Sequence, residues 1–136
     1  MYSKILVTLA LDHGLAPRLL GIARGLLARN GEIHALHVVE AAYGLAQATQ
    51  SSEVAKQAFE RAKSRMQEKL VGEARIKRTV VEGHVYRSIL DFAREQGADC
   101  IVMGSHRPGL SDYFIGSTAA RVVRHAACAV HVHREA

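Results

Sequence analysis

The sequence predicts a single α/β domain, a doubly wound sandwich in which about four helices cover a five-stranded, mainly parallel sheet. Two observations predict it. Short runs of branched apolar residues alternate with amphipathic stretches of ten or more residues, and parallel strands need crossover connections of this length. The 136 residues also show no internal repeat, low-complexity segment or linker, so we expect one domain over residues 1–136.

The first part of the chain is predicted to form a strand, a helix and a second strand. Residues 4–9 (KILVTL) are an apolar run of strand length. Pro17 suits the first turn of a helix, whose apolar stripe recurs at spacings of three and four and which Asn30-Gly31 is expected to close. Residues 32–39 (EIHALHVV) form the second strand.

The middle of the chain is predicted to form a variable loop, a long helix and a strand. Residues 41–50 have mixed polarity, which indicates the loop. Ser51 or Ser52 can cap the helix that follows, and Gly72 ends it. Residues 75–81 form the third strand.

The last part of the chain is predicted to form two helices and two strands in alternation. An apolar stripe that begins at Val85 marks the third helix, which Gly97 stops. Residues 98–103 form the fourth strand. Ser117-Thr118 opens the fourth helix, and residues 129–133 form the fifth strand.

Composition and charge narrow the class of protein. An apolar content of 49% with 23% charged residues is that of an ordinary soluble domain, without a run long enough to cross a bilayer or a signal peptide, so we expect a cytoplasmic protein. The net charge of +5 favours anionic partners, but the basic residues are dispersed and lack interleaved aromatics, so nucleic acid is not indicated. Cys100 and Cys128 are interpreted as small buried apolar residues.

A glycine-rich loop between the fourth strand and the fourth helix is the predicted ligand site. The apolar strand stops at Gly104, the loop carries Gly109 and Gly116, and Ser117 opens the helix. Glycine lets the backbone approach a ligand, and the free N–H groups of a helix's first turn attract a phosphate. The spacing Gly-x4-Gly-x6-Gly matches neither the P-loop nor the dinucleotide fingerprint, and glycines in such loops also serve as turn and cap residues.

The residue identities in this stretch are more specific than the spacing. Gly104-Ser105-His106, Gly116-Ser117 and residues 119–126 (AARVVRHA) resemble the carboxy-terminal signature of the universal stress protein family. The Gly-Ser-His-Arg-Pro loop resembles one branch of that family. The family's nucleotide-binding form reads Gly-x2-Gly-x9-Gly-Ser/Thr; here Arg107 stands at the second glycine and the loop is one residue shorter.

The resemblance implies a strand order of 3-2-1-4-5 and a bound ATP, or the related AMP or ADP, with or without Mg²⁺. This order places the loop that begins with Leu9 and Ala10 opposite the glycine loop, where the strand order reverses. The positions that match the family's nucleotide contacts are Val38 at adenine, Met103 and Gly104 below the ribose and phosphates, and Gly116, Ser117 and Thr118 at the phosphates.

Three side chains near this site have two interpretations each. The family usually has an aspartate at the position of Ala10; Asp12, two residues later, either replaces it as a ribose ligand or caps the first helix. Arg107 either grips a phosphate with its guanidinium or is a solvated loop residue. His106 either contacts a phosphate, as a hydrogen-bonding or acid–base group, or packs against the loop and orients it.

The fifth strand is expected to form a homodimer interface. The resemblance implies pairing of Ala129 to His133 with the same strand of a second copy across a two-fold axis. His131 and His133 share one face of this strand, where they either gather with their counterparts around a metal or a proton, or are half-exposed edge residues.

The function expected from these features is that of a small regulatory protein in stress response, which binds an adenine nucleotide and acts through dimer and protein-partner contacts. No catalytic residue is expected, because no lysine follows the glycine loop and no nucleophile–base pair is spaced for acyl transfer; ATP hydrolysis should at most be slow. The alternative is a nucleotide-free dimerisation module of the same fold, which the departures at Ala10 and Arg107 favour. An enzyme of the related adenylyl-transfer folds is a third option.

Overall fold

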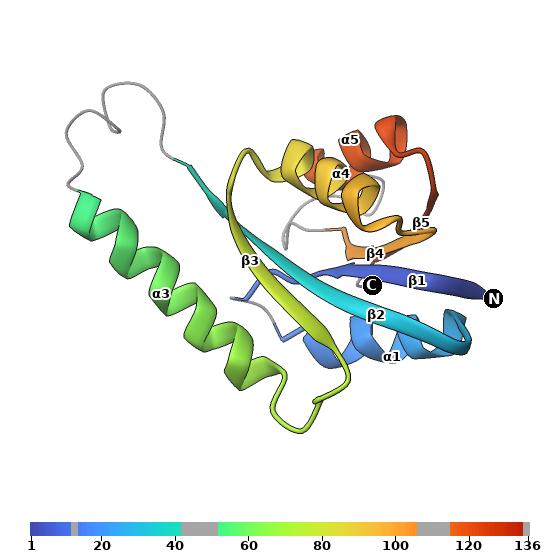
Figure 1. Ribbon diagram of the computed structural model, residues 1–136. Helices are drawn as coiled ribbons and strands as arrows, with labels where there is room; N and C mark the ends of the chain where they lie inside the picture. Colours follow the sequence, from blue (N-terminus) through green and yellow to red (C-terminus); the bar gives the residue numbers. More distant parts are fainter. Residues whose placement is uncertain (12–13, 42–51, 106–114, 135–136) are drawn as a thin grey trace.

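The computed structural model describes residues 1–11, 14–41, 52–105 and 115–134, and shows one five-stranded sheet with helices on both faces (Figure 1). The strands are β1 (Tyr2–Thr8), β2 (Leu27–Glu40), β3 (Lys77–Gly83), β4 (Cys100–Gly104) and β5 (Ala129–His133). The helices are α1 (Ala16–Leu26), α3 (Ser52–Lys69), α4 (Val85–Gln96) and α5 (Ser117–His125). All strand pairs are parallel in the order β3-β2-β1-β4-β5, which confirms the predicted fold class.

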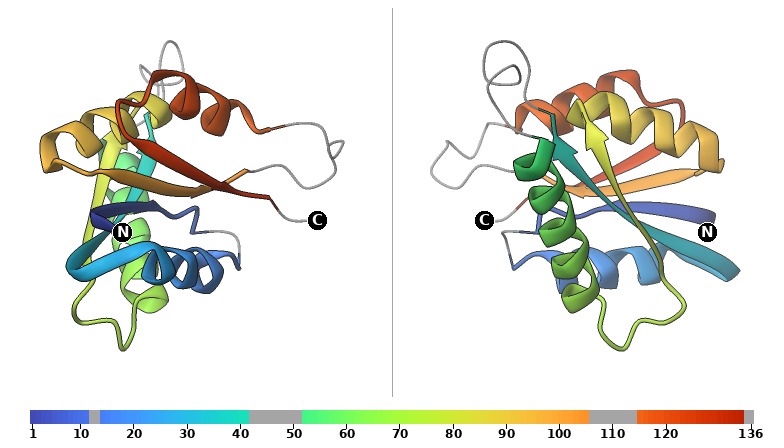
Figure 2. Two further views of the ribbon diagram at one scale, coloured as in Figure 1. Left: turned by 90° about the vertical axis from the view of Figure 1, so that its right-hand side faces the viewer. Right: turned by 60° about the vertical axis from the view of Figure 1, so that its left-hand side comes forward.

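The sheet separates two apolar cores. One lies between the sheet and helices α1 and α3, and the other between the sheet and helices α4 and α5, which cover the opposite face (Figure 2). Alternate residues of the central strand β1 enter opposite cores: Ile5 and Val7 pack with α1 and α3, and Leu6 packs with α4 and α5. Residues 100–103 of β4 are likewise buried on both sides. A strand covered on both faces reads as a continuous apolar run, which is why these two strands were visible in the sequence.

The predicted end of the first helix at Asn30-Gly31 is wrong. Helix α1 ends at Leu26, and Leu27 takes an extended conformation and pairs with Tyr2 of β1. The register between β1 and β2 then shifts before Lys4 pairs with Glu32, and Asn30 lies inside this irregularity with a left-handed φ of 67°. Asparagine tolerates this conformation, so the turn signal was real but belongs to a strand irregularity.

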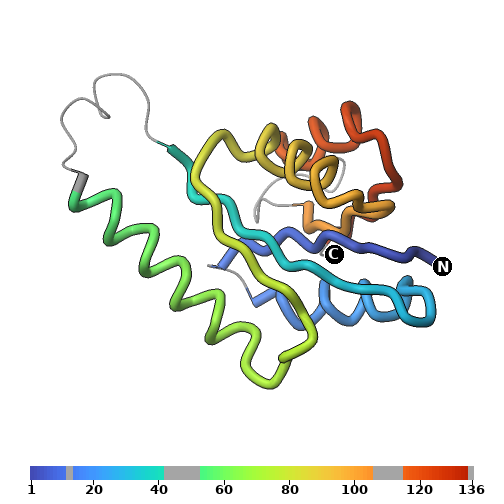
Figure 3. The backbone as a smooth tube through the Cα atoms, viewed as in Figure 1, coloured from blue at the N-terminus to red at the C-terminus, as the bar shows by residue number. Residues whose placement is uncertain are grey.

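The glycines predicted to end the second and third helices were interpreted correctly, whereas the bounds of the first four strands differ from the predicted ones by one to five residues. Gly72 follows α3 with a φ of 82°, and Gly97 follows α4 with a φ of 69°. The third strand begins at Lys77 rather than at residue 75, because Ile76 closes a turn by donating its N–H to the Glu73 carbonyl oxygen at 3.1 Å. The smooth tube in Figure 3 follows this turn from α3 into β3.

The two cysteines lie at the starts of β4 and β5 and differ in burial: Cys100 is the first residue of β4, and Cys128 directly precedes β5. Cys100 is buried and Cys128 is half-buried, so the prediction of two buried residues holds fully for Cys100 only. Burial raises the pKa of the Cys100 thiol to about 11, and burial also raises the pKa of Cys128. Both thiols are therefore poor nucleophiles at neutral pH.

Among the helices that the structure describes, none combines the length and the apolar character of a membrane span.

Asp99 joins the start of β4 to the start of β1 and gives the fold a pH-dependent contact. Its carboxylate accepts hydrogen bonds from the backbone N–H groups of Ser3 and Lys4, each at 2.9 Å. These two bonds, that of Ser3 first, hold the pKa of Asp99 below its usual range. A lowered folded-state pKa means that the ionised form stabilises the fold above the unfolded-state pKa, and that this contribution is lost as the pH falls through the folded-state pKa.

Asp99→Asn should therefore lower the free energy of unfolding by about 1 kcal/mol at neutral pH, a modest value because the carboxylate is solvent-exposed. Urea denaturation is measured at a series of pH values from neutral to acid. The difference in unfolding free energy between the variant and the unmodified protein should shrink to zero as the pH falls. Asp91→Asn, which removes an exposed carboxylate 3.7 Å from Arg94, is the matched control and should change little. A difference that stayed constant with pH would contradict this role.

Candidate functional site

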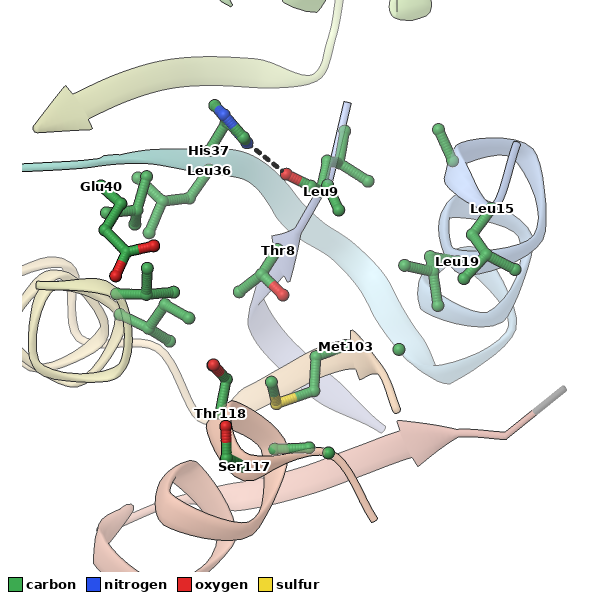
Figure 4. A pocket seen from close by; sticks show the side chains of 18 residues that line it. Thr8, Leu9, Leu15, Leu19, Leu36, His37, Glu40, Met103, Ser117 and Thr118 are labelled. Atoms are coloured by element: carbon green, nitrogen blue, oxygen red, sulfur yellow. Dashed lines mark hydrogen bonds between the residues drawn. The ribbon is translucent and has the colours of Figure 1, made fainter. Parts of the chain in front are cut away.

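A cavity of about 370 Å³ lies at the carboxyl ends of β1, β2 and β4 (Figure 4). The described residues that line it are Thr8, Leu9, Ala10, Leu15, Ala16, Leu19, Leu36, His37, Val38, Glu40, Val85, Ile89, Met103, Gly104, Gly116, Ser117, Thr118 and Ala119. Because β1 neighbours both β2 and β4, this is the point where the strand order reverses. Open parallel sheets bind ligands at this point, and the volume is that of a small-molecule site.

The N-terminus of α5 forms one wall of the cavity. Gly116 is its N-cap residue, and no side chain among the described residues caps the first turn, which also lacks an acidic residue. The Gly116 N–H donates to the Ser105 hydroxyl at 3.2 Å, which ties the helix start to the end of β4. Figure 4 shows the hydroxyl-bearing side chains of Ser117 and Thr118 on this wall. Free N–H groups, two hydroxyls and the positive end of a nine-residue helix together suit an anion.

The end of β1 is fixed by two hydrogen bonds to β2. The Leu9 N–H donates to the Leu36 carbonyl oxygen at 2.9 Å, and His37 Nδ1 donates to the Leu9 carbonyl oxygen at 2.6 Å. Thr8 is half-buried and lies centrally among the labelled lining residues in Figure 4, whereas Ala10 is exposed at the edge of the cavity. The first loop therefore begins from a rigid position beside the ligand space.

Apolar side chains at the start of α1 form another wall, and an apolar side chain of β4 lies beside α5. Leu15 is the N-cap residue of α1 and Leu19 lies on its first turns, whereas Met103 of β4 lies next to Thr118 and Ser117 (Figure 4). Gly104 ends β4, and a Cβ atom there would lie 3.2 Å from the Leu15 Cδ1 atom. This glycine therefore lets α1 approach the end of β4 closely.

Most of the predicted site residues meet in this one cavity. Those that line it are Leu9, Ala10, Val38, Met103, Gly104, Gly116, Ser117 and Thr118. Those that lie outside the described residues are Asp12, His106, Arg107 and Gly109. The structure therefore brings the ends of the first, second and fourth strands and the start of the last helix together, as the predicted strand order required.

Other lining residues were missed by the sequence analysis. They are Thr8, Leu15, Ala16, Leu19, Leu36, His37, Glu40, Val85, Ile89 and Ala119. Glu40 carries the only carboxylate among the described lining residues. Its position was a usable signal, because it ends the same strand as Val38 and shares its face.

Comparison with known proteins agrees with this architecture. A model of the universal stress protein family matches residues 1–134. The chain belongs to this family. Universal stress protein G of Shigella flexneri is 30% identical over 142 residues, covering 98% of this chain and 100% of that protein. Universal stress protein A homolog 2 of Coxiella burnetii is 34% identical over 139 residues, covering 95% of this chain and 92% of that protein.

Solved structures of the universal stress protein family share the fold. UspA from Lactobacillus plantarum matches with a TM-score of 0.79 and 27% identity over 98% of both chains. A family protein from Arabidopsis thaliana, solved with AMP bound, matches with a TM-score of 0.62 and 18% identity over 98% of this chain and 92% of that one. A universal stress protein in complex with cAMP matches with a TM-score of 0.59 and 18% identity over 97% of both chains.

Proposed function

We propose that the cavity binds an adenine nucleotide, ATP or the related AMP or ADP, as a regulatory ligand. The observation that carries this proposal is the N-terminus of α5, which no side chain of the described residues caps and which opens into a cavity of nucleoside size at the reversal of the strand order. The AMP and cAMP bound by two structural neighbours in the family are consistent with it. Mg²⁺ would bind together with a triphosphate rather than at a protein site of its own, since the described residues form no cluster of metal-binding side chains.

The order of the strands supports one orientation of such a ligand. The phosphate belongs at Gly116, Ser117 and Thr118, because anions prefer a helix N-terminus. Neighbouring strands lie about 4.8 Å apart, so the end of β2 is roughly 10 Å from the end of β4, with β1 between them. This span suits a nucleoside monophosphate with its ribose above β1 and its base beside β2.

The described part of the cavity lacks groups for rapid ATP hydrolysis. The first turn of α5 contains no lysine, and the carboxylate of Glu40 stands on the β2 side, away from α5 (Figure 4). Phosphoryl transfer depends on cations and positioned oxygen ligands around the reacting phosphate. We therefore propose that ATP acts as a ligand whose occupancy changes contacts with a protein partner.

Nucleotide release and calorimetry test the proposed function directly. The purified protein is denatured and any released nucleotide is identified by chromatography; stripped protein is then titrated with ATP, ADP and AMP. Bound adenine nucleotide, or saturable heat on titration, is the expected result. No carried nucleotide and no heat at millimolar concentration would instead favour a nucleotide-free dimerisation module.

Ala10→Asp should strengthen nucleotide binding about tenfold, because a carboxylate at this exposed edge of the cavity can accept hydrogen bonds from the ribose hydroxyls. The measurement is calorimetric titration with AMP and with 2′-deoxy-AMP. The gain should appear with AMP and be largely absent with 2′-deoxy-AMP, which lacks one of the two hydroxyls. An equal gain with both ligands would show that the ribose lies elsewhere.

We further propose that the protein forms a homodimer through β5. This strand forms one edge of the described sheet, and an edge strand can pair with a second strand. Val130 and Val132 pack with the core below α4 and α5, so His131 and His133 lie on the opposite face. Light scattering at micromolar concentration should give the mass of a dimer, and a monomer at all concentrations would exclude this interface.

A further inference from the structure

The charges around the cavity are arranged unequally. Glu40 is the only acidic residue in the described lining, and no hydrogen bond or ion pair to its carboxylate is formed within the described part of the chain. The N-terminus of α5, with its partial positive charge, forms a different wall. In Figure 4 the carboxylate lies on the β2 side and Ser117 and Thr118 on the α5 side. The cavity therefore suits a ligand with an anion at one end and a hydrogen-bond donor at the other.

The backbone holds Glu40 in this place. Glu40 is the last residue of β2 and pairs with Gly83 of β3, and the next residue, Ala41, donates its N–H to the Gly83 carbonyl oxygen at 3.1 Å. Leu36 and Val38 pack with the core below α4 and α5, and Glu40 continues their alternation. Its side chain thus leaves the sheet on the same face as α5, beside the end of the strand where the base is placed above.

A carboxylate distinguishes two kinds of purine. An ionised carboxylate only accepts hydrogen bonds, so it pairs with an amino group at C6 and not with an oxygen at that position. Against a 6-oxo purine two acceptors would face each other and repel, a penalty that water around the exposed Glu40 side chain reduces but does not remove. Adenine carries the amino group; hypoxanthine and guanine carry the oxygen.

We propose that Glu40 selects 6-aminopurine nucleotides by accepting a hydrogen bond from the amino group at C6. This proposal rests on the proposed function, because it requires a nucleotide with its phosphate at α5. Glu40 is then a specificity-determining residue at the base end of the cavity, separate from the glycine loop and from the first turn of α5.

The test compares AMP with IMP, which share ribose and phosphate and differ at C6 of the base. Binding of each to the full chain is measured by calorimetry for the unmodified protein, for Glu40→Gln and for Glu82→Gln. Glu82 is an exposed glutamate near the end of the adjacent strand β3 and does not line the cavity, so its variant is a control for the lost charge. Circular dichroism confirms that each variant is folded.

The expected result is that the unmodified protein and Glu82→Gln bind AMP about tenfold more tightly than IMP. Glu40→Gln should bring the ratio close to one, because an amide can donate to the oxygen as well as accept from the amino group. Equal affinities in the unmodified protein, or an unchanged ratio in Glu40→Gln, would overturn this proposal and leave the proposed function standing.

Two further outcomes separate the alternatives. In the first, Glu40→Gln weakens the binding of AMP and of IMP equally. If the unmodified protein also binds 2′-deoxy-AMP less tightly than AMP while the variant binds both alike, Glu40 contacts the ribose. This result overturns the proposal. If neither nucleotide binds any of the proteins, the proposed function fails and the selectivity proposal fails with it.

Discussion

Gly116→Val should weaken nucleotide binding about a hundredfold or more while leaving the protein folded, because the new side chain would fill the space of the phosphate and displace its charge-assisted hydrogen bonds. Gly116 is buried at the N-cap of α5 and lines the cavity. Its φ of −58° and ψ of 153° are open to any L-residue. The substitution therefore tests space at the helix N-terminus rather than backbone strain.

The matched control for this substitution is Gly25→Val. Gly25 is exposed on α1, and a Cβ atom there would meet nothing within 4 Å. Calorimetry with ATP and AMP should show normal affinity for this variant and its loss for Gly116→Val, with both proteins giving cooperative thermal transitions. Normal affinity in folded Gly116→Val would mean that the phosphate lies away from α5.

Ile101→Ala should lower the free energy of unfolding by about 3 kcal/mol, the usual cost of a cavity left by a fully buried aliphatic side chain. Ile101 has no exposed surface and packs in the core below α4 and α5, together with Val122 of α5. Urea denaturation followed by circular dichroism measures the loss. Since β4 and α5 frame the cavity, the same variant should also bind nucleotide less tightly at temperatures where it begins to unfold.

Val123→Ala provides the comparison for Ile101→Ala. This substitution also removes an aliphatic side chain from the α5 side of the sheet. Val123, however, is 50% exposed on α5. Its substitution should change the unfolding free energy by less than about 0.5 kcal/mol. Similar losses for the two variants would contradict the described arrangement of the core.

Strand order and core strands were predictable because they depend on strong, redundant signals. The apolar run at residues 100–103 fits a strand buried on both faces. The residue identities around Gly104 and Gly116 indicated the family, and the resemblance to the family implied the strand order. The boundary at Asn30 was not predictable from local sequence. A left-handed asparagine closes a helix as readily as it marks a strand irregularity, and only the pairing of Leu27 with Tyr2 decides between them.

The site was predicted best where it is built from strand ends. Leu9 follows from the strand order and from the rule that parallel strands direct their carboxyl ends to one edge, whereas Val38 and Met103 were predicted from the resemblance to the family. The helical contribution of Leu15 and Leu19 was missed, because an apolar stripe predicts burial without indicating whether a residue faces the sheet or an opening beyond its edge. Glu40 was missed because the family's motif assigns its ligand contacts to other positions.

Helix α5 starts at the cavity and ends where the chain turns into β5. Its nine residues make a rod about 14 Å long, and the Ala126 N–H closes its far end on the Val122 carbonyl oxygen at 2.8 Å. One tip of this stiff segment thus faces the cavity at Gly116, and the other tip leads through residues 126–128 into the edge strand β5. Any tilt imposed at one tip must be accommodated at the other, which gives this short helix the geometry of a lever.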